Sequence, residues 1–204
     1  MTSVPSDIAF TPTVKAIQSA KGSRESYARM EQRGGWKTRV TEQLSSFIAE
    51  RDMFYLGTAN AKGQPYIQYR GGPQGFLKVL DDRTLAFADF AGNQQYITIG
   101  NLAENAQAFI FLMDYANRKR MKLWGRARVV ENDHSLLEKL QDEQYPARVE
   151  RAIVFEIEAW DVNCPQHIHV RYAENKITPV VEALQARIEE LESTLRTLTK
   201  TKPE

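Results

Sequence analysis

The sequence concentrates its thiol and imidazole side chains in one short segment, NCPQHIH. This segment contains Cys164, the only cysteine, and His167 and His169, two of the three histidines. Such residues bind zinc when three or four of them converge, and a thiol beside a histidine base can act as a nucleophile. The remaining histidine, His134, lies far upstream on a predicted polar helix. We therefore predict neither a metal site nor a catalytic thiol, and the sequence assigns no catalytic residue.

An arginine followed by two glycines ends a predicted strand in the segment YRGGPQGFL. The guanidinium of Arg70 can hold a phosphate through two hydrogen bonds. Gly71 and Gly72 have no side chains, so the backbone can come close to a ligand with its amide donors uncovered. The same residues also fit an ordinary strand that ends in a glycine turn, and this segment alone does not decide between the two.

A second segment with donors, AGNQQYITIGNL, leads from a predicted strand into a predicted short helix. We expect Asn93 to cap this helix, because asparagine is favoured at that position, and the free amides of the first turn then attract an anion. Gln94 and Gln95 add neutral donors, while Gly100 and Asn101 are typical of a helix end. A plain strand-to-helix corner is the alternative.

Cations gather in a third segment, NRKRMKLWG. Side chains alternate between the two faces of a strand, so Arg118, Arg120 and Lys122 should line one face. Three cations on one face repel each other unless an anion, an acidic partner chain or water separates them. The segment therefore predicts either an anion site or a solvated strand.

The periodicity of apolar residues predicts the elements that carry these side chains. Prolines and glycines interrupt residues 1–35, which predicts an extended arm with one or two short helices. Residues 36–51 place Val40, Leu44 and Ile48 on one face at helical spacing, which predicts an amphipathic helix.

The middle of the chain predicts antiparallel strands in hairpins, because segments rich in aromatic and β-branched residues alternate with turn residues. The predicted strands are 52–59 with 64–70, 75–80 with 85–90, 106–115 with 120–130, and 151–162 after a helix over 133–143. Chains of this kind protect their sheet edges by closure, so we predict a closed or nearly closed barrel.

The C-terminal residues predict an amphipathic helix with a heptad repeat. Its apolar residues follow one another at alternating spacings of three and four, which is the a/d seam of a coiled coil. The residues of this seam are Val181, Leu184, Ile188, Leu191, Leu195 and Leu198. A seam of about three heptads can pair with a second helix or lie on the barrel of its own chain, and the sequence fits both.

The composition excludes some partners. The 27 basic and 26 acidic side chains among the 204 residues nearly cancel, so we expect no nucleic-acid partner. No segment approaches the roughly 20 apolar residues of a membrane span, and no export signal is evident at the N-terminus, so we expect no membrane and a soluble, cytoplasmic protein.

The three polar segments, in this order and spacing, resemble those of the FMN-binding split-barrel proteins related to pyridoxamine 5'-phosphate oxidase. The likeness covers roughly residues 36–170 and lies in GQPYIQYRGG, FADFAGNQQ and RKRMKLWGRARVV. It implies a mainly β, α+β fold: an antiparallel split β-barrel of about six strands with flanking helices and the C-terminal heptad helix. The expected parts are an arm (1–35), an FMN-binding domain (36–172) and a C-terminal helix and tail (173–204).

The resemblance also implies which residues approach the cofactor. Arg70 with the two glycines would lie near the phosphate or ribityl chain, and Asp89 beside the isoalloxazine edge. The segment after the last barrel strand would line the pocket. Asn163, Gln166 and His167 would form hydrogen bonds with the flavin ring of the same or of the neighbouring subunit. The implied FMN-binding residues are Arg70, Gly71, Gly72, Asp89, Asn93, Gln94, Gln95, Arg120, Lys122, Gln166 and His167.

The sequence departs from the oxidases at two points. Gln94 and Gln95 stand where the oxidases have cations, so Arg70, Arg120 or Lys122 must meet the phosphate charge. The heptad helix stands in place of the oxidases' substrate-binding strand. We therefore expect a related subgroup, marked by the RGGPxGFL and NCPQHI segments, and not a true pyridoxamine phosphate oxidase.

These implications give the expected function. The resemblance implies a homodimeric FMN flavoprotein that passes two electrons between FMN and a small-molecule substrate or nicotinamide donor. A non-catalytic protein that stores or senses FMN is one alternative. A relative that binds haem or a deazaflavin is another, and His167 or His169 would then be the first candidates for an axial ligand.

Overall fold

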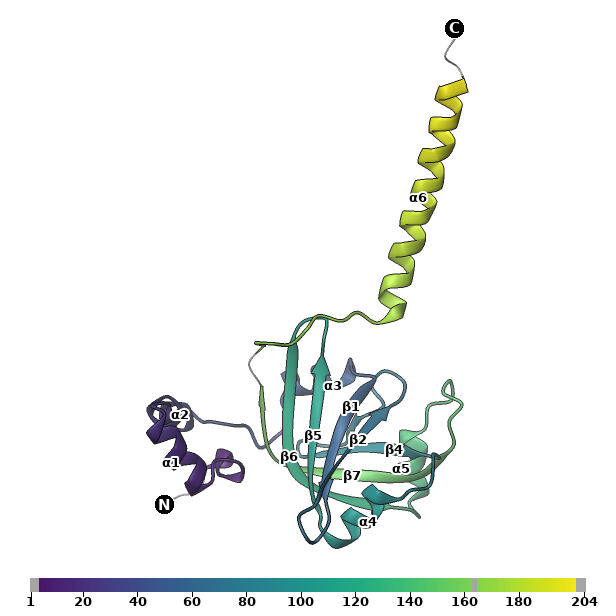
Figure 1. Ribbon diagram of the computed structural model, residues 1–204. Coiled ribbons are helices and arrows are strands. Elements are labelled where there is room, and N and C mark those ends of the chain that lie inside the picture. The colour runs from purple at the N-terminus through teal and green to yellow at the C-terminus, as the bar shows by residue number, and fades with distance from the viewer. Residues whose placement is uncertain (1–3, 163–164, 201–204) are drawn as a thin grey trace.

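The computed structural model describes residues 4–162 and 165–200, with side chains up to residue 197. Within these ranges, one antiparallel sheet of seven strands forms the body of the protein, in the order β2-β1-β5-β6-β7-β4-β3 (Figure 1). The strands in chain order are β1 (Met53–Ala59), β2 (Pro65–Gly71), β3 (Lys78–Val79), β4 (Thr84–Phe90), β5 (Gln107–Asp114), β6 (Lys119–Val130) and β7 (Val149–Val162).

All three predicted hairpins are confirmed, and the first shows why local sequence determines them. In the turn between β1 and β2, the backbone amides of Lys62 and Gln64 each donate to the side chain of Asn60 at 3.0 Å. Gly63 takes the positive φ of 81° that this turn requires. Along β1, alternate side chains such as Phe54 are fully buried, as expected for a strand with one face on the core.

The sheet curves into a barrel that is split between its edge strand β2 and the opposite edge, which the two-residue β3 and the rest of β4 form; β2 pairs with neither of them in the described residues. A side-chain contact joins these edges instead, because Arg70 at the end of β2 donates to Asp89 at the end of β4. The prediction of a mainly β, α+β split barrel with flanking helices is therefore confirmed.

Helix α4 (Ile97–Glu104) packs against the strands beside this split. Thr98 donates to Gln68 of β2 at 2.6 Å, and Asn101 donates to Thr58 of β1 at 2.9 Å. These bonds satisfy polar groups that burial would otherwise leave without partners.

The predicted bounds of α4 were wrong. Asn93 does not cap it, because Gln94 and Tyr96 both have left-handed backbones (φ 58° and 53°), which delays the first helical residue to Ile97. Gly100 and Asn101 lie inside the helix and do not end it. The buried hydrogen bond of Asn101 fixes that side chain within the helix.

The core fills the barrel, and α3 (Glu42–Ala49) covers it with the buried Leu44, Phe47 and Ile48. Figure 1 shows α3 toward one end of the barrel and α4 toward the other. The helix predicted from residue 36 begins only at Glu42, because Thr41 caps it by accepting from the amide of Leu44 at 3.3 Å. On the other side of β4 and β7, α5 (His134–Leu140) covers a smaller apolar cluster.

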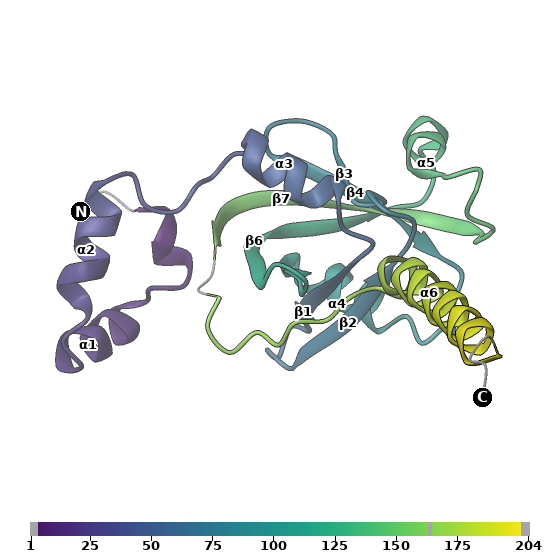
Figure 2. The same ribbon diagram turned by 90° about the horizontal axis from the view of Figure 1, so that it is seen from above.

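Residues before α3 form a small helical unit beside the barrel (Figure 2). It consists of the 3-10 helix η1 (Pro5–Ile8), α1 (Pro12–Ala20) and α2 (Arg24–Gln32). Polar bonds close it: Ser6 donates to Glu31 at 3.2 Å, and Arg24 donates to both Glu31 and Gln18. The two short α-helices predicted for residues 1–35 are thus present, but they fold back into a unit closed by η1 and do not form an extended arm.

An aromatic stack joins this helical unit to the sheet. Phe10 packs on Trp36 with ring centroids 5.1 Å apart, and Trp36 stacks on Trp124 of β6 at 4.4 Å. The neighbouring residue, Lys37, forms a backbone bridge with Trp160 of β7. These contacts hold the helical unit against β6 and β7.

The C-terminal helix α6 (Glu174–Lys200) projects away from the barrel (Figure 1). All of its described side chains, residues 174–197, are exposed. Leu198, the last residue of the predicted seam, has a side chain outside the described set. None of the helices in the described part of the chain is long and apolar enough to cross a membrane.

Candidate functional site

Three charged side chains meet at the split of the barrel. Arg70 from β2 and Arg151 from β7 both donate to the carboxylate of Asp89 on β4, Arg151 at 3.1 Å. The register of the sheet sets this meeting, because β4 and β7 pair Asp89 directly with Arg151. All three side chains are at most 13% exposed. Two largely buried guanidiniums thus share one largely buried carboxylate.

Further carboxylates balance the charge of Arg151. Its Nη2 lies 3.2 Å from Glu150 and its Nε 3.3 Å from Glu131. Burial, the largest single effect, would lower the pKa of the Arg151 guanidinium, but the charge and hydrogen bond of Asp89 together with the charges of Glu150 and Glu131 outweigh it and raise that pKa above its usual value. Arg151 is therefore a permanent cation at this site.

Arg70 has a buried donor atom, Nε, that no hydrogen bond among the described residues satisfies. Its Nη1 bonds to Asp89. Leaving a charged donor buried and unbonded costs about 1–3 kcal/mol, so such a group is expected to have an acceptor when the site is filled.

The turn between β4 and α4 forms the other wall of this site. Asn93, Gln94 and Gln95 lie here, and Asn93 accepts a bond from the amide of Gln95 at 3.2 Å. The ring of Tyr96 lies 5.5 Å from the guanidinium of Arg151. Gln94 and Tyr96, two of three consecutive residues, have left-handed backbone, which is uncommon for residues other than glycine. Such strained residues concentrate at functional sites, where the surrounding structure holds them in place.

The resulting pocket is small and polar, with a volume of about 60 Å³. It brings together five of the predicted site residues, Arg70, Asp89, Asn93, Gln94 and Gln95. Its size and cations suit a group such as a phosphate. It is too small for a tricyclic ring.

The two glycines after Arg70 have structural reasons of their own. A Cβ on Gly71 would meet the ring of Tyr69 at 2.8 Å, and one on Gly72 would meet Phe76 at 2.7 Å. The amide of Gly72 donates to the carbonyl of Asp52 at 3.0 Å. The expected uncovered donor at Gly72 is thus bonded within the chain.

The cations of the third segment lie elsewhere. Arg118 sits in the turn before β6 with φ 53°, so the expected alignment of three cations on one strand face was wrong. Arg120 lines a separate cavity of about 740 Å³ together with Arg118. Lys122 forms an ion pair with Asp161 at 3.2 Å and lies over the ring of Trp124. An acidic neighbour and an aromatic face thus satisfy this cation.

The segment after β7 is exposed where it is described. Gln166 and His167 are solvent-accessible, and His167 has a positive φ of 61°. Asn163 and Cys164 lie outside the described residues. Among the described residues no group of three histidine, cysteine or acidic side chains could hold a metal ion.

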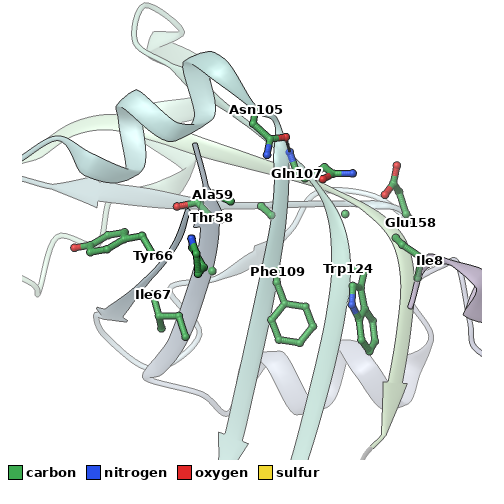
Figure 3. Close-up of a pocket in the computed structure, with 14 residues that line it drawn as sticks. Ile8, Thr58, Ala59, Tyr66, Ile67, Asn105, Gln107, Phe109, Trp124 and Glu158 are labelled. Atoms are coloured by element: carbon green, nitrogen blue, oxygen red, sulfur yellow. Dashed lines mark hydrogen bonds between the residues drawn. The ribbon is translucent and has the colours of Figure 1, made fainter. Parts of the chain in front are cut away.

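A third cavity lies on the outer face of the sheet and is mainly apolar, with a volume of about 330 Å³ (Figure 3). Phe109 and Trp124 stand side by side on its floor, and Ile67 and Ile8 border it from β2 and from the helical unit. Ile67 is 69% exposed, which is unusual for so large an apolar side chain.

Comparison with known families identifies the chain. A family model described as Pyridoxamine 5'-phosphate oxidase matches residues 40–167, more than half of the sequence. The chain belongs to this family. The match spans β1 to β7 and contains the Arg70–Asp89–Arg151 cluster and every lining residue of the outer apolar cavity except Ile8.

Solved structures share the fold at low sequence identity. An FMN-binding protein from Syntrophomonas wolfei is 15% identical, with a TM-score of 0.51, covering 72% of this chain and 97% of its own. HupZ from Group A Streptococcus is 17% identical, with a TM-score of 0.50, covering 65% of this chain and 99% of its own. No curated protein sequence matches this chain.

Proposed function

We propose that this protein is an FMN-binding flavoprotein and that the pocket at the barrel split holds the FMN phosphate. The observation that carries the proposal is Arg70, a buried guanidinium with an unused Nε in a small polar pocket of a chain that belongs to the pyridoxamine 5'-phosphate oxidase family. When bound, FMN supplies two-electron redox chemistry. We propose an oxidoreductase whose partner is a small molecule or nicotinamide donor.

The residues of the chain would divide this work. Arg70 and Arg151 hold an anion by charge and direct hydrogen bonds, and Asp89 fixes the orientation of both guanidiniums. Gln94 and Gln95 offer neutral donors in place of cations, so the positive charge comes from the two arginines. Because Asp89 offsets part of that charge, we expect moderate affinity for a dianion.

We further propose that the flavin-binding unit, residues 36–172, works as a homodimer. Arg120, Gln166 and His167 line other surfaces than the phosphate pocket. A second subunit would bring its own set of these residues to the first subunit's pocket. The exposed apolar outer face of β2, β1 and β5 supports this proposal, since large exposed apolar patches mark interaction surfaces.

The proposal is tested by ligand titration. Purified protein should bind FMN with a visible absorbance band near that of the free flavin, and protein that ignores added FMN would contradict the proposal. Arg70→Met and Arg151→Met should each weaken FMN binding about tenfold or more, because a hydrogen bond to a charged group contributes about 1.5–3 kcal/mol. Riboflavin, which lacks the phosphate, should bind both variants and the unchanged protein alike.

The matched control is Arg128→Met, since Arg128 is an exposed cation on β6 outside the phosphate pocket. It should leave FMN affinity unchanged. If Arg70→Met weakened riboflavin and FMN equally, the pocket would not be the phosphate site. Anaerobic addition of NADH or NADPH then separates the alternatives: prompt bleaching of the flavin supports an oxidoreductase, and no bleaching supports a carrier or sensor.

A further inference from the structure

The C-terminal helix exposes an apolar stripe that the barrel does not cover. Ile177, Val181, Leu184, Ile188 and Leu191 lie on α6 and are each between 40% and 60% exposed. Every described side chain from 174 to 197 is exposed, so no face of the helix rests on its own chain. Figure 1 shows the helix extending away from the sheet along its whole length. The alternative that α6 lies on its own barrel is therefore not what the structure shows.

The residues of this stripe repeat with the period of a coiled coil. In the two central heptads Val181 and Ile188 occupy a positions and Leu184 and Leu191 occupy d positions, whereas Ile177 at d and Leu195 at a flank them. β-branched residues at a with leucine at d, as in these central heptads, favour two parallel strands over trimers or tetramers. We propose that α6 forms a parallel two-stranded coiled coil with α6 of a second copy of this chain.

Charge at the flanking positions supports the same partner and direction. Arg187 occupies a g position and Glu192 the e position of the next heptad. In a parallel pair, g of one helix faces the following e of the other, so each side of the symmetric pair gains one Arg187–Glu192 contact. An antiparallel pair would place g beside g and e beside e, and this contact would be lost. In the single chain Arg187 pairs with Glu190 at 2.5 Å, an exposed contact that is easily exchanged.

The remaining features of the helix agree with pairing. Pro179 occupies an f position, on the face opposite the seam, so its missing amide does not disturb the interface. The 27 residues of α6 span about 40 Å, enough for more than three heptads. A coiled coil this short is marginal on its own, but a second contact between the barrels would raise the effective concentration of the helices.

Cysteine cross-linking of the full-length protein tests the inference directly. In a Cys164→Ser background, Leu191→Cys places a thiol on the seam, where a parallel pair brings the two copies of residue 191 together. Ser193→Cys, at the outward f position, is the matched control. Mild oxidation should convert the Leu191→Cys protein to a disulfide-linked dimer and leave the Ser193→Cys protein largely monomeric on a non-reducing gel. Equal cross-linking of both, or none with Leu191→Cys, would overturn the proposal.

Charge exchange tests the direction. Arg187→Glu should reduce the rate of cross-linking of the Leu191→Cys protein about three- to tenfold, and adding Glu192→Arg should restore it. Arg187→Glu that speeds cross-linking, or a double variant that does not recover, would contradict a parallel pair. All of these positions are exposed on a helix apart from the barrel, so circular dichroism and thermal unfolding should stay close to those of the unchanged protein. The inference does not depend on FMN, because the readout is the same with and without flavin.

Discussion

At the scale of single residues, buried charges are satisfied by specific partners. Asp114, at the end of β5, is only 6% exposed and accepts from Asn117 through the backbone amide at 3.0 Å and the side-chain amide at 2.8 Å. Arg51 lies 3.3 Å away. Burial raises the pKa of the Asp114 carboxyl, but the bonds from Asn117 and the charge of Arg51 outweigh it, so the pKa is lowered overall.

This pKa direction predicts a pH-dependent loss in the Asp114→Asn variant. A carboxyl whose folded pKa is lowered stabilises the fold fully above its unfolded pKa, near 4, and loses that contribution as the pH falls through the lower folded value. The variant should be less stable by about 1–3 kcal/mol at pH 7. The difference should shrink below about pH 4 in urea unfolding at several pH values. A gap independent of pH would show that the charge of Asp114 is unimportant.

Residue contacts were also the hardest feature to predict from the sequence. The resemblance to the FMN-binding split-barrel proteins implied that Arg70, Asn93, Gln94 and Gln95 share one site, whereas the residues alone left each segment undecided. Arg151 was missed, because its place beside Asp89 depends on a register between strands 62 residues apart. Arg151 is the one cation of β7, in the segment VERAIVF, and this was the available signal.

At the scale of elements, local rules predicted the hairpins well and helix starts poorly. Turn residues and alternation are encoded within a few positions, as in the Asn60 turn. The start of α4 depends instead on the left-handed backbone of Gln94 and Tyr96. Neither glutamine nor tyrosine favours this conformation. The surroundings impose that conformation, so propensity alone could not reveal it.

Strand β6 depends on a glycine at a close contact with β7. The register shifts between Trp124 and Gly125, and a Cβ on Gly125 would lie 2.0 Å from the carbonyl oxygen of Glu156 and 2.8 Å from the ring of Phe155. The backbone of Glu156 cannot move aside as the end of a flexible side chain can. This position therefore tolerates no side chain without movement of β7.

Gly125→Ala should accordingly destabilise the protein by roughly 3 kcal/mol or more, measured by denaturant unfolding, because it overpacks the sheet. Gly100→Ala is the matched control. Gly100 lies within α4, and its Cβ would meet nothing within 4 Å. The control should gain about 0.5–1 kcal/mol, because alanine favours helix. Equal effects at the two sites would mean that the close contact is relieved cheaply.

At the scale of the whole molecule, the outer face of the sheet carries a continuous apolar surface. The register of β2, β1 and β5 places Tyr69 beside Tyr55 and Phe111, and Ile67 beside Gly57 and then Phe109. Tyr69 is 60% exposed. With a net charge of only +1, long-range repulsion between two copies is weak. This surface and the α6 seam are two separate places where copies could meet.

Ile67→Glu tests the sheet contact. Because position 67 is exposed in the single subunit, a glutamate there should leave the stability of that subunit nearly unchanged. In the dimer the same carboxylate would be buried without a partner, which destabilises the interface. We expect the concentration for dimer dissociation to rise at least about tenfold in sedimentation experiments. Combining Ile67→Glu with Leu184→Glu should give a monomer, because both contacts are then lost. Lys62→Glu, in the exposed β1–β2 turn, is the control, and an equal shift there would count against this interface.

The aromatic stack between the helical unit and the sheet also gives the protein an internal optical signal. All three tryptophans lie where residues 36–39 cross β6 and β7: Trp36 on Trp124, and Trp160 with its indole donating to the carbonyl of Arg39 at 2.8 Å. Lys122 lies over both stacked rings at 5.2–5.4 Å, where its charge acts on their excited states. Tryptophan fluorescence therefore reports mainly on whether the helical unit is attached to the sheet. If that unit detached, the wavelength of the emission would change before the barrel itself unfolds.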